Sequence, residues 1–136
     1  MSVGITGRRK FVVRDHETAM LAYARLARLS HERKQTAGRD RFVILCGREA
    51  CLAGWLDVAA ACRELVLASN PRHLLSHSAT FADALRDPEN ERFFGQLEAF
   101  CSFEQAEHLL RENDQTLEST TEVSAGEIAL AELENC

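Results

Sequence analysis

The sequence predicts an all-α protein: a compact bundle around one long central helix at about residues 42–69, followed by several short capped helices. Leu and Ala dominate the apolar residues, a bias that favours helices over sheets. The 136 residues include only two prolines, so long segments are free to be helical. Apolar residues recur at three- and four-residue spacing, as in amphipathic helices. A chain of this length can bury a core without disulfides or metal.

The first predicted helix runs from residue 16 to about residue 35. Asp15 suits its N-cap, and Glu17 suits the positive end of the helix dipole. Gly38 is expected to follow the end of this helix, because glycine adopts the left-handed conformation common at that position.

The central helix carries two rows of residues at seven-residue spacing. One row is Ile44, Cys51, Val58 and Leu65. The other contains only small residues, namely Gly47, Gly54, Ala61 and Ala68. Small side chains let another helix approach closely, so we expect the second row to form a helix-packing seam. Replacing Gly54 by Leu is then expected to disrupt the helix packed there.

An alternative assignment makes the same region α+β, with a short β-α-β unit at 10–46. Phe11–Val13 and Phe42–Leu45 would be its two strands, as their β-branched content suggests. Two short strands would have no third strand beside them, and an isolated pair is marginally stable. The all-helical assignment is therefore preferred.

Helix-start signals divide the next part of the chain into short helices. Asn70-Pro71 and Asp87-Pro88 each combine a cap with a favoured first helical residue. Ser78 or Thr80 can cap the piece between them, and Ser102 with Gln105 forms a capping box. We assign residues 1–113 to a single helical domain.

Residues 114–136 are predicted to be a flexible acidic tail with a short terminal helix. They contain six acidic residues and no Lys or Arg, whereas residues 1–48 contain eleven Lys/Arg against four Asp/Glu. Ser124 with Glu127 forms another capping box. We expect residues 115–123 to be mobile, and the terminal helix to form when docked on its own domain or on a partner.

No catalytic or cofactor motif is present, so the sequence leans away from an enzyme and no cofactor is expected. The five cysteines lie mostly in apolar helical patterns, and their odd number argues against a disulfide framework. Residues 1–14 lack an apolar signal segment, and no apolar run is long enough for a membrane span. The expected location is therefore cytoplasmic.

Two alternatives involving chemistry or nucleic acid stay open. A metal-binding or thiol-dependent enzyme would use two histidines four residues apart on a helix, completed by nearby cysteines: His73, His77, Cys62 and Cys101. The other reading of the two histidines is a polar helix edge. Cys46 would be the most reactive thiol if it followed a strand and lay near a helix N-terminus. Nucleic-acid binding would place six basic residues on phosphates: Arg8, Arg9, Lys10, Arg14, Arg39 and Arg41.

The preferred function is a non-enzymatic helical protein–protein interaction module. The absence of catalytic motifs, the small-residue seam and the acidic tail favour this class. The sequence does not identify the partner, and a second copy of the chain is one option.

Overall fold

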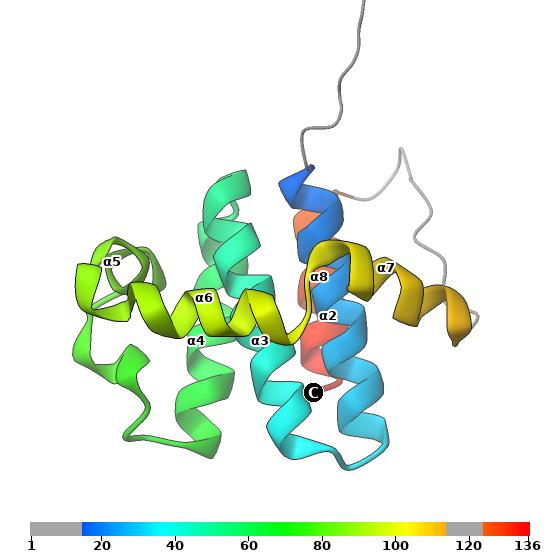
Figure 1. Cartoon of the computed structure of the whole chain (residues 1–136), viewed down its shortest axis with the longest axis horizontal. Helices are drawn as coiled ribbons and strands as arrows, with labels where there is room; N and C mark the ends of the chain where they lie inside the picture. Colours follow the sequence, from blue (N-terminus) through cyan, green and yellow to red (C-terminus); the bar gives the residue numbers. More distant parts are fainter. Residues whose placement is uncertain (1–14, 114–123) are drawn as a thin grey trace, which may run out of the picture.

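The computed structural model describes residues 15–113 and 124–136, and the regular elements in these two ranges are all helices (Figure 1). In chain order they are α2 (His16–Glu32), α3 (Thr36–Ala53), α4 (Leu56–Ser69), the 3₁₀ helix η1 (Leu74–His77), α5 (Phe81–Arg86), the 3₁₀ helix η2 (Pro88–Asn90), α6 (Glu91–Phe100), α7 (Phe103–Glu112) and α8 (Ala125–Glu134). The predicted all-α class is confirmed.

The first helix begins where the sequence predicts. The Asp15 carboxylate accepts a hydrogen bond of 3.0 Å from the backbone N–H of Glu17. The helix ends earlier than expected, because Lys34 adopts a left-handed φ of 58°. The next helix starts at Thr36, so Gly38 lies inside α3 and does not follow a helix end.

The alternative β-α-β unit is wrong for the part of it that the structure describes. Residues 42–46 belong to α3, while Phe11–Val13 lies outside the described residues. Every residue from Phe42 to Gly47 is buried, because α3 contacts α2, α4, α5 and α6 on its different sides. A helix buried all round has a continuous apolar run, and such a run resembles a buried strand in sequence.

The single long helix at 42–69 is also wrong: the chain forms two helices, α3 and α4, with a corner at Gly54 and Trp55. Gly54 has a φ of 88°, and its N–H bonds back to the carbonyls of Ala50 and Cys51. A residue in this left-handed conformation ends a helix, and glycine adopts it without steric cost. The seven-residue repeat continued through the corner because each of the two helices has its own apolar face.

This corner changes what a substitution at Gly54 should do. A Cβ at this position would meet no atom within 4 Å, so the cost is conformational and not a packing cost. Gly54→Ala should lower the free energy of unfolding by about 1–2 kcal/mol. Gly54→Asn should cost less, since Asn tolerates the left-handed region. Urea unfolding of these two variants and of Gly54→Leu gives their relative stabilities. A Leu variant far less stable than the Ala variant would contradict a purely conformational cost at this position.

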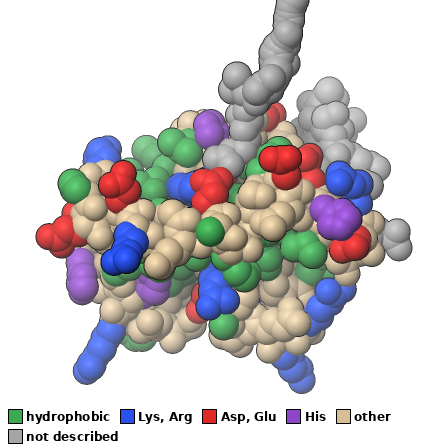
Figure 2. All heavy atoms as spheres, viewed as in Figure 1, with side chains coloured by type: hydrophobic (Ala, Val, Ile, Leu, Met, Phe, Trp, Pro, Cys, Tyr) green, Lys and Arg blue, Asp and Glu red, His purple; other side chains and the backbone are tan. Residues whose placement is uncertain are grey.

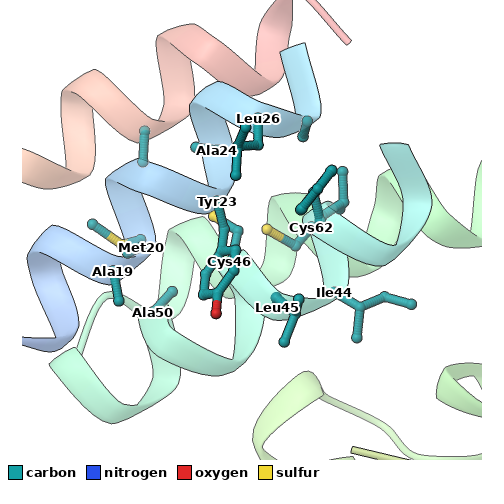
Figure 3. Close-up of a cluster of buried hydrophobic side chains, with 14 of the residues drawn as sticks. Ala19, Met20, Tyr23, Ala24, Leu26, Ile44, Leu45, Cys46, Ala50 and Cys62 are labelled. Atoms are coloured by element: carbon teal, nitrogen blue, oxygen red, sulfur yellow. The ribbon is translucent and has the colours of Figure 1, made fainter. Parts of the chain in front are cut away.

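The core lies mainly between α2 and α3, and α4 closes one side of it (Figure 3). Ala19, Met20 and Tyr23 of α2 are fully buried against Leu45 and Cys46 of α3. Alanines on α2 keep the two helix backbones close together. These contacts make α2 and α3 the frame on which the other helices sit.

The α6 and α7 helices cross the front of this frame and meet at a corner (Figure 1). Tyr23 ties the corner to the core, because its hydroxyl donates a buried 2.8 Å hydrogen bond to the Cys101 carbonyl. Thr80 caps α5, Asp87 caps η2, and Ser102 with Gln105 forms a capping box on α7, as predicted. The predicted cap at Asn70-Pro71 is wrong, because the next helix, η1, begins at Leu74 with His73 as its N-cap. The helix before Asn70-Pro71 ends at Ser69, as predicted.

The terminal helix is present as α8, and it is docked on the same chain. Ser124 and Glu127 form the predicted capping box at its start. It packs against α2 and α4, on the opposite side of α2 from the view in Figure 1. The predicted mobility of residues 115–123 concerns residues outside those described.

No helix among the described residues is both long enough and apolar enough to cross a lipid bilayer.

Candidate functional site

An apolar groove runs between α3 and the corner joining α6 to α7. Its volume is about 440 Å³. The lining residues come from α3, from the corner and from α7: Phe42, Phe100, Cys101, Glu104, Gln105, His108 and Leu109. Figure 2 shows hydrophobic side chains reaching the surface beside α7, with charged and histidine side chains around them.

Two phenylalanine rings form the floor and one wall of this groove. Phe42 is buried in the core, whereas Phe100, the last residue of α6, is 41% exposed. Their ring centroids lie 5.5 Å apart in a tilted arrangement. The Arg41 guanidinium carbon lies 5.0 Å from the centroid of the Phe100 ring, as in a cation–π contact. Phe100 is thereby in contact with both Phe42 and Arg41 while remaining 41% exposed.

The rim of the groove is polar. Glu104, Gln105 and His108 all lie on α7, and His108 Nε2 is 3.2 Å from a Glu112 oxygen. Burial raises the pKa of the Cys101 thiol to about 11, so this sulfur is protonated at neutral pH. An apolar floor with a polar rim suits the binding of apolar side chains from another molecule. The Cys101 thiol donates a 3.6 Å hydrogen bond to the Ser102 carbonyl.

A second cluster is formed by charged side chains and extends from the core to the surface. Glu49 of α3 is fully buried, and its carboxylate is 2.7 Å from His16 Nδ1 and 2.7 Å from an Arg48 nitrogen. Arg48 also contacts Glu98 of α6 at 3.0 Å. The cluster therefore links the start of α2 to α3 and α6. Sequence analysis missed it, and the only signal was a charged pair, Arg48-Glu49, between two apolar runs.

The four residues of the predicted seam do not lie along one helix. Gly47 is buried in α3, and a Cβ there would come within 3.0 Å of three ring atoms of Phe81. Gly54 occupies the corner with open space around it. Ala61 is half-buried in α4 and Ala68 is exposed. Close approach at a seam position is thus seen for Gly47, where the neighbour is the α5 side chain of Phe81.

The two histidines of the metal alternative do not share an α-helical face. His73 is the N-cap of η1, where its Nδ1 accepts a hydrogen bond from the Leu75 N–H, and His77 is exposed at the other end of this 3₁₀ helix. Burial lowers the pKa of His73, which packs edge-on against Phe93. In the part of the chain that the structure describes, no three His, Cys, Asp or Glu side chains are grouped to hold a metal ion.

The cysteines are free and mostly enclosed by apolar side chains. Burial raises the pKa of Cys51 and Cys136 to about 11, and raises that of the fully buried Cys62 well above its usual value. Cys46 lies in the middle of α3, so no helix N-terminus lies beside it as the strand assignment required. Cys46, Cys62 and Cys101 are buried, and Cys51 and Cys136 are partly buried.

The basic residues of the nucleic-acid alternative do not form a common patch where they are described. Arg39 is 8% exposed, and its guanidinium contacts Asp40 at 2.6 Å and donates to the Cys136 carbonyl at 3.2 Å. Arg41 lies over the Phe100 ring. The other four basic residues of this set lie outside the described ranges: Arg8, Arg9, Lys10 and Arg14.

Comparisons of this chain with protein-family models, with curated proteins and with solved structures found no match.

Proposed function

We propose that this chain is a non-enzymatic protein–protein interaction module whose groove at the α6–α7 corner binds an apolar segment of a partner. The observation that carries the proposal is Phe100, which is 41% exposed in an apolar groove of about 440 Å³. Aromatic side chains in such positions commonly dominate binding energy. The polar rim on α7 gives the surface the apolar centre and hydrophilic edge typical of an interface.

The groove suits a peptide segment better than a small reactive substrate. Two phenylalanine rings and Leu109 offer apolar contacts, and the Cys101 thiol stays protonated. A partner helix or extended segment would insert one or two large apolar side chains between α3 and α7. The neighbouring Arg41 and Glu104 supply charges of both signs for orientation.

Charge substitution at Phe100 tests the proposal. Phe100→Glu should abolish binding of the groove's partner, because the carboxylate would be buried among apolar atoms. Leu52→Glu is the matched control: Leu52 is 54% exposed and lies ten residues after Phe42 on α3. Quantitative affinity capture should give a set of proteins retained by wild type and Leu52→Glu, and reduced at least tenfold by Phe100→Glu.

Sedimentation of the purified proteins tests whether the chain self-associates. A dimer that is lost only in Phe100→Glu would identify the partner as a second copy of the chain. Thermal unfolding must show that both variants are folded. If Phe100→Glu folds and neither its bound proteins nor its sedimentation differs from those of Leu52→Glu, the groove is not an interaction site.

A further inference from the structure

The face of α2 and α4 beneath α8 has the properties of a selective helix-binding surface. Three residues of α8 are buried on it, at three- and four-residue spacing: Gly126, Ala129 and Leu133. This face is separate from the groove at the α6–α7 corner, because the two share no lining residue. An inference about α8 therefore stands or fails independently of the proposed function.

Trp55 selects for glycine at one point of this face. A Cβ at residue 126 would lie within 3.0 Å of three atoms of the Trp55 ring. The ring is also held by a hydrogen bond, since its Nε1–H donates to the Glu17 carboxylate at 2.6 Å. A helix with a larger residue at this position would have to displace the Trp55 ring.

Two arginines select for a carboxylate six residues further along. Glu132 is contacted through one oxygen by Arg25 Nε at 2.7 Å and through the other by Arg28 Nε at 2.5 Å. The Glu132 side chain is 13% exposed, so the contact is largely shielded from water. Charge-assisted hydrogen bonds of this kind are stronger than neutral ones and fix the register of the helix.

We propose that this face is a binding site for a helix of the pattern Gly-x-x-Ala-x-x-Glu-Leu, that α8 is its resident ligand, and that α8 of a second copy of the chain can replace it. The second copy is the occupant the structure supports, because residues 126–133 carry this pattern and fit the site. Displacement is feasible because two of the three buried residues are Gly and Ala, which bury at most a methyl group each. Attachment to the same chain favours the resident helix through its high effective concentration.

A labelled peptide of residues 124–136 tests the site directly. In the full-length Gly126→Leu chain, the resident α8 can no longer sit under Trp55, so the face should be open. This chain should bind the peptide at least tenfold more tightly than wild type does, as measured by fluorescence anisotropy. A peptide carrying Glu132→Lys, and a Gly126→Leu chain that also carries Arg28→Glu, should each bind at least tenfold more weakly.

Equal binding by wild type and Gly126→Leu would overturn the proposal, as would no binding to a Gly126→Leu chain whose circular dichroism shows it to be folded. If that variant does not fold, hydrogen exchange of the wild-type chain decides. Amides of α8 should then exchange at least a hundredfold faster than those of α3. Protection of α8 equal to that of α3 would show that it is a fixed part of the core.

Discussion

Replacing Glu49 by alanine should lower the free energy of unfolding by about 3–5 kcal/mol, because it removes one partner of a buried ion pair. Glu49 is fully buried, and both its carboxylate oxygens have partners at 2.7 Å, one on His16 and one on Arg48. The change leaves the Arg48 guanidinium mostly enclosed, with its side chain only 12% exposed. Urea unfolding followed by circular dichroism measures the loss.

The matched control is Glu98→Ala, which removes the other carboxylate that contacts Arg48. The Glu98 side chain is 42% exposed, so its interaction is screened by water and should contribute less than about 1 kcal/mol. Glu49→Gln should lie between the two, since it keeps the shape of the side chain and part of its hydrogen bonding. Equal losses for Glu49→Ala and Glu98→Ala would mean that burial does not determine the strength of this cluster.

Replacing Gly47 by alanine should destabilise the protein by about 1–3 kcal/mol, through overpacking. In most helix interiors this substitution is favourable by about 1 kcal/mol, because alanine has the higher helix propensity. Here the added methyl would come within 3.0 Å of three ring atoms of Phe81, a side chain only 2% exposed with little room to move. Thermal and urea unfolding both report the change.

Gly95 in α6 provides the opposite case within the same protein. It is exposed, and a Cβ there would meet nothing within 4 Å. Gly95→Ala should therefore raise the free energy of unfolding by about 0.5–1 kcal/mol. The two substitutions are chemically identical, so opposite signs would isolate the contact with Phe81. A stabilising effect at both positions would show that α5 shifts away at no cost.

Local signals in the sequence predicted local structure well. Asp15, Thr80, Ser102 and Ser124 all cap helices in the structure, because a cap depends on a few neighbouring residues. The Asn70-Pro71 boundary follows from backbone restrictions that no tertiary contact can remove.

Features that depend on three-dimensional contacts were predicted less well. Gly54 was predicted to be a packing residue, but it ends a helix with a positive φ. The sequence alone does not distinguish a glycine at a helix end from a glycine at a helix contact. The partners of Glu49 lie on α2 and α3, and the role of Phe100 depends on where α6 ends. A single sequence does not show contacts between distant residues, such as that of His16 with Glu49, until the topology is known.

The position of α8 determines when it can pack on the other helices during synthesis. Glu132 lies 107 residues after Arg25 and 104 residues after Arg28 in the chain. While the polypeptide grows from its N-terminal end, α2 and α3 can fold together long before residue 132 exists. Helix α8 can therefore dock only after translation has passed residue 132. A chain stopped before that point leaves exposed the face of α2 and α4 that α8 otherwise covers.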